Sequence, residues 1–253
     1  MHVSVRESLR KLRTDYLDYS VSVEELMDSL DALVKAGKVL YLGASNLPAW
    51  FVAGCNSYAR AKGQATFVIL QTKWNVPERD IERELLPMAQ TYGMAIAPWS
   101  ALASGRLQSE NQLAKLQAEG TFRKGWGGDS LTKEEMEYCK TLTEVAVAHG
   151  LGDESVAPVA LAYLMTKYPL VFPIVAFHTA EQLSDNIRAL TITLTDAEMK
   201  RLESIKPLDL GFPLSMIGED PKLTGVPTGS NLLELGPIDW LVDKKVYLSQ
   251  LDK

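Results

Sequence analysis

The sequence predicts an α/β fold in which the strands of a parallel sheet alternate with helices. Four short apolar runs have the composition of strands, at residues 39–42, 66–70, 94–97 and 170–175, and a stub of a fifth lies at 15–18. Helical periodicity fills the intervals and the connections are short, which is typical of a parallel sheet covered by helices. A closed barrel of eight such units takes about 250 residues. The chain has 253 residues but too few strands for one.

The stretch from Gly37 to Asn46, GKVLYLGASN, contains a predicted helix end, a predicted strand and a turn predicted to face a ligand. Gly37 supplies a left-handed helix stop, the run 39–42 is the predicted strand, and a Gly-Ala-Ser-Asn turn follows it. Ligands of α/β proteins bind at the carboxyl ends of parallel strands. Ser45 and Asn46 are therefore the first polar groups that we expect to face a ligand.

Helix boundaries are marked by capping residues and by glycine. Capping boxes at Ser22–Glu25, Thr132–Glu135 and Thr195–Glu198 predict helices that run to about residues 36, 149 and 205. Asp80 is predicted to cap a helix that runs to Tyr92 and is kinked by Pro87. The other predicted helices span 3–13, 48–62, 155–167, 180–189 and 237–250. Residues 104–130, with Trp126-Gly127-Gly128, are predicted to form a long loop.

Composition limits the partners and the compartment. The net charge of −6 argues against nucleic acid or an anionic membrane as the main partner. No apolar run reaches the roughly 18 residues that span a membrane, and the amino terminus lacks a signal-peptide core. Cys55 and Cys139 lie on apolar helix faces, so we predict buried free thiols, and no metal-ligand spacing is present. We expect a cytoplasmic protein.

Five longer segments carry a resemblance to a known family. From Arg6 to about Pro213 the chain resembles the aldo-keto reductases, in the branch of fungal aryl-alcohol dehydrogenases and norsolorinic acid reductase-like proteins. The matching segments are SLRKLRTDYLD, VEELMDSLDALVKAGKVLYLGASNLPAW, LPMAQTYGMAIAPWSALASGRL, VALAYLMTKYPLVFPIV and DLGFPL. The resemblance implies a partial (β/α)8 TIM barrel without its amino-terminal units. We expect one domain at residues 1–206, with the tail 207–253 packed on it.

The resemblance also implies an NAD(P)-linked oxidoreductase of aryl or polyketide-type aldehydes, ketones or alcohols, with NADP(H) as cofactor and a small-molecule substrate. Ser45, Asn46 and Gln71 match the residues that hold the nicotinamide carboxamide, and Trp99 matches the ring that stacks on it. The loop that follows the pyrophosphate is matched by Ser100, Leu102, Ser104 and Arg106. The adenosine 2′-phosphate and adenine contacts are matched by His178, Thr179, Gln182 and Asn186. Each residue taken singly could instead be an ordinary cap at a strand or helix end.

The chain departs from the family pattern after its last strand. Phe177 stands where a small residue is expected, and the basic residues that hold a 2′-phosphate are absent. Only His178 offers partial charge, and an unperturbed histidine is mostly neutral near pH 7. Of the contacts that the resemblance implies, the one to the 2′-phosphate of NADP(H) is therefore the least supported by this sequence.

A second departure concerns catalysis, which in this family needs an Asp, a Tyr, a Lys and a His. The first three lie on units that would precede Met1, and the His lies on the strand that begins near Tyr16. In this sequence Asp18 runs directly into Tyr19 and Ser20, so no residue is assigned as catalytic. Loss of general-acid assistance costs roughly 10²–10⁴-fold in rate, and each missing oxyanion donor roughly 10²–10³-fold. We expect an impaired catalyst.

Two other functions remain open at this stage. The first is a non-redox enzyme of a natural-product pathway, such as a dehydratase, isomerase or cyclase. Glu78, Arg79 and Asp80 could supply its acid–base groups, although a solvated helix cap is the simpler interpretation. The second is a non-catalytic binding or assembly protein, because a partial barrel leaves open sheet edges that a homodimer would cover.

Overall fold

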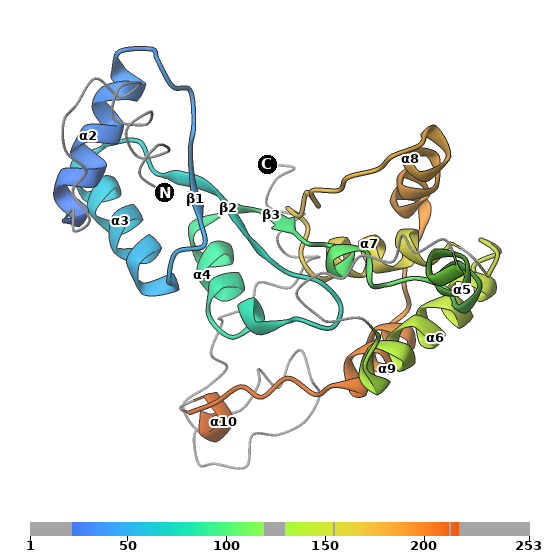
Figure 1. Ribbon diagram of the computed structural model, residues 1–253. Coiled ribbons are helices and arrows are strands. Elements are labelled where there is room, and N and C mark those ends of the chain that lie inside the picture. Colours follow the sequence, from blue (N-terminus) through green and yellow to red (C-terminus); the bar gives the residue numbers. More distant parts are fainter. Residues whose placement is uncertain (1–21, 119–129, 154, 213, 218–253) are drawn as a thin grey trace. The chain divides into compact units, whose positions relative to one another are not determined.

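The computed structural model describes residues 22–118, 130–153, 155–212 and 214–217 (Figure 1). The chain divides into two compact units, which are described separately. One comprises the residues up to Leu42 together with Trp50–Phe67, and the other comprises Gly43–Ala49 and the residues from Val68 onwards. The predicted helices at 3–13 and 237–250, the strand stub at 15–18 and the Trp126-Gly127-Gly128 segment lie outside the described residues.

The first unit is built from helix α2 (Val23–Lys35) and helix α3 (Ala49–Lys62). Ser22 caps α2 as predicted, because its hydroxyl accepts a hydrogen bond from the backbone N–H of Glu25 at 3.1 Å. Asn56 of α3 is buried and pairs with both backbone groups of Phe67, donating to its carbonyl at 3.1 Å and accepting from its N–H at 2.8 Å. This pair fixes the point at which strand β2 begins.

The sheet contains β1 (Leu42–Ser45), β2 (Phe67–Lys73) and β3 (Ala95–Trp99), in the order β1-β2-β3. β2 and β3 are parallel, with Ile69 opposite Ala95 and Lys73 opposite Trp99. The predicted alternation of strands and helices is thus confirmed for this part of the chain, since α3 follows β1 and α4 (Leu85–Tyr92) follows β2. The register places Gln71, Lys73 and Trp99 on one face of the sheet.

The predicted strand at 39–42 is wrong in its position. Leu40 and Tyr41 are 80% and 78% exposed, and the strand begins only at Leu42. The alternation of buried Leu42 and Ala44 with Gly43 and Ser45 marks the true strand. A Cβ atom at Gly43 would lie 2.9 Å from Cγ2 of Ile69 in β2. Glycine at this position therefore allows β1 and β2 to approach, and Ser45 becomes the last residue of the strand.

The predicted buried strand at 170–175 is also wrong. Val171 is buried and bridges Ile96 of β3, and the N–H groups of Phe172 and Ile174 donate to carbonyls of β3. However, Phe172 is 58% exposed and Ile174 is 46% exposed. Pro173 between them has no N–H to donate, which is typical of an edge position. The segment is an extended edge alongside β3 and not a strand covered on both faces.

Two helix predictions also need correction. Asp80 does not open a helix to Tyr92, because a 3₁₀ turn at Asp80–Glu82 precedes α4 and the caps make no side-chain hydrogen bond. Pro87 lies in the first turn of α4, where a missing N–H has no partner to lose, so no kink results. The predicted loop 104–130 contains a 3₁₀ turn at Ala103–Gly105 and helix α5 (Glu110–Ala118).

The remaining helices of the second unit follow the sheet in the sequence. They are α6 (Lys133–Ala148), α7 (Val156–Lys167), α8 (Ala180–Ile187), a 3₁₀ turn at Arg188–Thr191, α9 (Asp196–Ile205) and α10 (Leu214–Ile217). Of these, α6 and α7 contribute many of the buried residues of the unit. The predicted capping boxes of α6 and α9 are confirmed, with Thr132 and Glu135 at one and Thr195 and Glu198 at the other. α6 packs against α7 and α9 (Figure 1).

Both cysteines are buried and free, as predicted. Burial raises the pKa of the Cys139 thiol, so the protonated form predominates there. Within the described ranges, no helix combines the length and apolar character needed to cross a bilayer. The predicted domain boundary at residue 206 stays a prediction.

Candidate functional site

Polar side chains meet where β1 and β2 end. Ser45 is the last residue of β1, and its hydroxyl donates to Oε1 of Gln71 in β2 at 3.3 Å. The backbone N–H of Asn46 donates to the carbonyl of Gln71 at 3.1 Å. All three side chains are exposed. The structure therefore brings together Ser45, Asn46 and Gln71, and it presents amide donors and acceptors beside a hydroxyl.

Trp99 completes this group from the neighbouring strand. It is the last residue of β3, and its indole N–H donates to Oδ1 of Asn46 at 2.9 Å. Asn46 has a φ of 53°, a left-handed conformation that asparagine tolerates better than most residues. The left-handed turn after β1 thus places the side-chain amide of Asn46 within hydrogen-bonding distance of the Trp99 indole. The hydrogen bond fixes the orientation of a half-buried aromatic ring beside the amide groups.

The loop after β3 contains four of the predicted residues, Ser100, Leu102, Ser104 and Arg106. Ser100, Ala103 and Ser104 have φ values of 57°, 48° and 57°, whereas Leu102 has a φ of −103°. Ala103, Ser104 and Gly105 are thus left-handed in succession, with φ values of 48°, 57° and 85°. The hydroxyls of Ser100 and Ser104 lie 3.0 Å apart. The loop is thus folded back on itself directly after Trp99.

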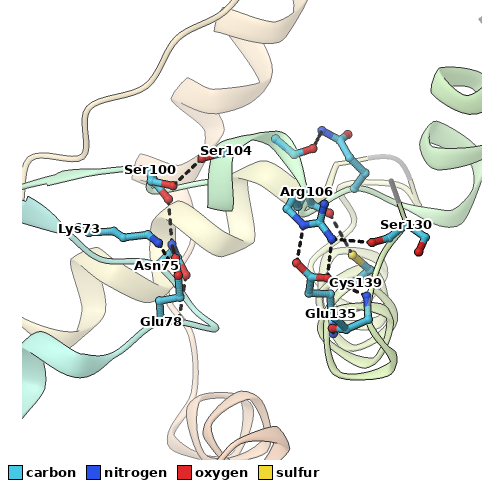
Figure 2. A network of polar contacts seen from close by, with 12 residues as sticks. Lys73, Asn75, Glu78, Ser100, Ser104, Arg106, Ser130, Glu135 and Cys139 are labelled. Carbon is cyan, nitrogen blue, oxygen red and sulfur yellow. Dashed lines mark hydrogen bonds and ion pairs between the residues drawn. The ribbon is translucent and has the colours of Figure 1, made fainter. Parts of the chain in front are cut away.

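A polar cluster of Lys73, Asn75 and Glu78 supports this loop through Asn75 (Figure 2), and sequence reasoning missed two of its members, Lys73 and Asn75. Asn75 is fully buried, and its amide donates to the carbonyl of Ser100 at 3.1 Å and to Oε2 of Glu78 at 2.7 Å. Glu78 also accepts from the ammonium of Lys73 at 2.5 Å. The signal for Lys73 was present in the sequence. It lies two positions after Gln71, so the two side chains share one face of the strand.

Arg106 belongs to a different group in Figure 2. Its guanidinium makes a two-pronged pair with Glu135 of α6, with Nε to Oε1 at 2.5 Å and Nη2 to Oε2 at 2.7 Å. Nη2 also donates to the carbonyl of Ser130 at 2.8 Å, and Arg106 is only 6% exposed. Its charge is therefore already matched by a carboxylate inside the protein.

This pair makes a prediction about acid stability. The hydrogen bonds from Arg106 lower the pKa of Glu135 below its ordinary value of 4.5. A lowered pKa contributes stability that is complete above the ordinary value and is lost as pH falls through the folded-state pKa. We expect Glu135→Gln to lower the free energy of unfolding at neutral pH. We also expect the free energy of unfolding of this variant to fall less than that of the wild type as the pH is lowered. Urea midpoints measured between about pH 7 and about pH 3 test this. An equal decrease of the urea midpoint with falling pH in the wild type and in Glu135→Gln would contradict this prediction.

The residues predicted for the adenosine end gather at the start of α8. The hydroxyl of Thr179 accepts from the N–H of Gln182 at 3.3 Å, and Oε1 of Gln182 accepts from the N–H of His178 at 2.8 Å. Thr179 and Gln182 therefore already cap the helix. His178, Thr179 and Gln182 are exposed, and Asn186 is half-buried one turn later. Phe177 beside them is 45% exposed.

The interpretation of Glu78, Arg79 and Asp80 as a solvated helix cap is wrong for the first two. Glu78 is held by Lys73 and Asn75. Arg79 is 6% exposed and donates to the carbonyl of Lys206 at 2.6 Å, while Asp80 pairs with Arg83 at 2.6 Å. Among the described residues, each of the three is thus engaged by a partner within the protein. None is presented as a free acid or base.

Comparison with known proteins decides the family. Residues 1–207 match the model of the aldo/keto reductase family. The chain belongs to the aldo/keto reductase family. The fold is accordingly of the TIM-barrel type, and the parallel strands β2 and β3 are part of it. The chain is also similar to the thermostable aldo-keto reductase Tm1743, whose structure contains the inhibitor epalrestat. The two share 26% identity with a TM-score of 0.55, over 80% of this chain and 65% of the other.

Curated fungal aldo/keto reductases are more similar in sequence. The aldo-keto reductase ausK of Aspergillus calidoustus is 46% identical over 90% of this chain and 59% of its own length. The aryl-alcohol dehydrogenase [NADP(+)] of Phanerodontia chrysosporium is 41% identical over 87% of this chain and 59% of its own length. The norsolorinic acid reductase stcV of Emericella nidulans is 44% identical over 88% of this chain and 57% of its own length. The chain thus spans less than two thirds of the length of these aldo/keto reductases.

Aldo/keto reductases use NAD(P)H, and the donor set at the strand ends fits the nicotinamide part of such a cofactor. A carboxamide needs both hydrogen-bond donors and acceptors, which Ser45, Asn46 and Gln71 supply together. Trp99 supplies a ring face at the same edge of the sheet. The fit is poorer at the adenosine end, because residues 176–187 contain no lysine or arginine.

Proposed function

We propose that this chain binds NAD(P)H at the carboxyl ends of its strands and serves an NAD(P)-linked oxidoreductase of aryl or polyketide-type aldehydes, ketones or alcohols. The observation that carries the proposal is the hydrogen-bonded set of Ser45 with Gln71 and Asn46 with Trp99. The names of the relatives, among them an aryl-alcohol dehydrogenase and a norsolorinic acid reductase, support the substrate class.

The residues at the strand ends have separate tasks in this proposal. Ser45 and Gln71 fix one another and would hold the carboxamide, which sets the rotation of the nicotinamide ring. Asn46 orients Trp99, whose ring would cover one face of the nicotinamide and exclude water from it. The loop from Ser100 to Ser104 would carry the phosphates. The bound cofactor supplies the hydride, and these residues position it.

Among the described residues, no histidine lies at the strand ends to transfer a proton to the substrate. His149 is held by Glu198 at 2.9 Å, and His178 lies exposed at the start of α8. Neither histidine lies among the groups that the strand ends bring together. We therefore propose that the chain binds the cofactor better than it catalyses reduction. Loss of a general acid costs roughly 10²–10⁴-fold in rate.

Two measurements on the purified chain test this function. Binding of NADPH is measured by calorimetry, and oxidation of NADPH by an aromatic aldehyde is followed by the absorbance of the reduced nicotinamide. We expect saturable binding in the micromolar range, where a free energy of about −8 kcal/mol applies, together with slow or undetectable turnover. A folded chain that binds neither NADPH nor NADH would overturn the proposal.

Cofactor preference gives a sharper prediction. Because residues 176–187 lack lysine and arginine, NADPH should bind no more than about threefold tighter than NADH. His178→Arg places a permanent cation at the predicted 2′-phosphate contact and should raise the preference for NADPH by about tenfold. His149→Arg serves as the control, since that residue lies at the end of α6. A strong NADPH preference in the wild type would show that another residue holds the 2′-phosphate.

The alternatives are less well supported. The non-redox enzyme depended on Glu78, Arg79 and Asp80, and the contacts described above already occupy these three side chains. A homodimer remains a proposal. Its motivation is the exposed apolar edge that contains Phe172 and Ile174, and a strictly monomeric species in light-scattering chromatography would count against it.

A further inference from the structure

The predicted phosphate loop lacks an obvious cation. A dinucleotide carries a negatively charged diphosphate, which proteins hold with backbone N–H groups and with lysine or arginine. Arg106 was the predicted basic residue of this loop. Its guanidinium is instead buried against Glu135, and moving it to a ligand would leave that carboxylate without its partner. A positively charged side chain for the diphosphate must therefore be one other than Arg106.

Lys73 lies at the right end of the sheet. It is the last residue of β2, directly opposite Trp99 in the register of β2 and β3. Its ammonium lies 6.0 Å from the centre of the Trp99 ring, and its side chain is 37% exposed. The chain leaves Trp99 to enter the loop of Ser100 and Ser104. Lys73 is thus the cation beside the residue from which the loop begins.

A relay of hydrogen bonds joins Lys73 to the loop itself (Figure 2). The ammonium donates to Oε1 of Glu78, and the amide of the buried Asn75 donates both to Oε2 of Glu78 and to the carbonyl of Ser100. The N–H of Glu78 in turn donates to Oδ1 of Asn75 at 2.9 Å. These bonds fix the carboxylate, and through it the ammonium, relative to Ser100.

We propose that Lys73 is a cofactor-binding residue that donates to the diphosphate of the dinucleotide, in place of Arg106. This inference rests on the proposed function and deepens it. An ammonium has three donors, and Glu78 occupies one of them. Glu78 acts as a holding partner that keeps Lys73 extended beside Trp99 and gives up part of the ammonium when the diphosphate arrives. The ion pair of Lys73 with Glu78 differs from that of Arg106 with Glu135, because both Lys73 and Glu78 are partly exposed. Transfer of the Lys73 ammonium from Glu78 to the diphosphate therefore leaves no buried carboxylate without a partner.

The experiment compares the full chain with Lys73→Met, Lys73→Arg and Lys35→Met. Lys35 is a matched control, since it is also paired to a carboxylate, that of Asp31 at 2.6 Å, and is not a predicted contact. Each protein is titrated by calorimetry with NADPH and with ADP-ribose, which contains the diphosphate but no nicotinamide. Circular dichroism confirms that the variants are folded.

We expect Lys73→Met to weaken both ligands by about tenfold, Lys73→Arg to remain within about threefold, and Lys35→Met to bind as the wild type does. The wild type should also lose affinity more steeply with added salt than Lys73→Met does. Glu78→Gln should strengthen binding of both ligands, because it removes the competitor.

Three results would overturn the inference. Wild-type affinity of Lys73→Met for both ligands would show that Lys73 does not touch the cofactor, and the proposed function would stand. A loss for NADPH alone would place Lys73 at the nicotinamide instead of the diphosphate. No binding of either ligand by the folded wild type would remove the proposed function, and the inference would fall with it.

Discussion

Replacing Arg79 with methionine is expected to lower the free energy of unfolding by about 3–5 kcal/mol, because it removes one of the two cations that balance the carboxylates of Glu82 and Glu203. Arg79 donates to the carbonyls of Glu203 and Lys206, at 3.3 and 2.6 Å. Its guanidinium lies 3.9 Å from the carboxylates of Glu82 and Glu203. Methionine fills a similar volume but offers no donor to any of these groups.

The surroundings of Arg79 explain why the loss is large. Glu82 accepts from the indole of the buried Trp74 at 3.0 Å and pairs with Lys167 at 3.1 Å. Lys167 also pairs with Glu203 at 2.7 Å. Burial alone would lower the pKa of Lys167, but the two carboxylates outweigh it and raise that pKa. Without Arg79 one lysine must balance both carboxylates.

Urea unfolding at neutral pH measures this effect. Arg201→Met is the matched control, because Arg201 also pairs with a carboxylate, that of Glu144, but about half of each side chain is exposed. Exposed pairs contribute little, so its midpoint should stay at the wild-type value. Equal midpoints for the two variants would contradict the account of the Arg79 cluster.

Removing the Trp99 ring is the second large effect. We expect Trp99→Ala to weaken NADPH binding by about 10–100-fold, since stacking on an aromatic ring contributes about 1–3 kcal/mol. The same change deprives Asn46 of the donor that holds it at 2.9 Å, so the amide loses its fixed orientation. Calorimetric titration of the folded variant measures the loss.

Trp50→Ala is the control for this change. Trp50 lies on α3, is 72% exposed and is not a predicted cofactor contact. Its removal should leave the affinity for NADPH unchanged. Equal effects of the two substitutions would mean that Trp99 has no special relation to the cofactor.

Local signals in the sequence predicted most of the helices of this fold. Thr132 with Glu135 and Thr195 with Glu198 opened helices where expected, because a capping box satisfies donors within three residues of one another. The start of β1 was misplaced, because Leu40 and Tyr41 are apolar in a segment that the structure leaves exposed. Composition alone does not show which apolar residues are covered.

The candidate site was predicted in part, and its supporting contacts were not. Ser45 and Asn46 were predicted from their place at a strand end, and Gln71 and Trp99 were predicted from the family resemblance. The structure joins the four residues in two hydrogen-bonded pairs. The pairing of Arg106 with Glu135 crosses 29 positions of sequence and depends on how α6 packs. Asn75 could not be recognised for the same reason, since its partner Ser100 lies 25 residues away. Such contacts follow from tertiary packing and leave no local pattern.

The most direct test of the central claim is quenching of tryptophan fluorescence by NADPH, compared between the wild type and Trp99→Phe. Phenylalanine keeps a ring for stacking but removes the fluorophore and the donor to Asn46. If the strand ends form the nicotinamide site, the wild type shows saturable quenching, and Trp99→Phe binds NADPH with most of that quenching lost. Equal quenching in the two proteins, or none in a folded wild type, would contradict the claim.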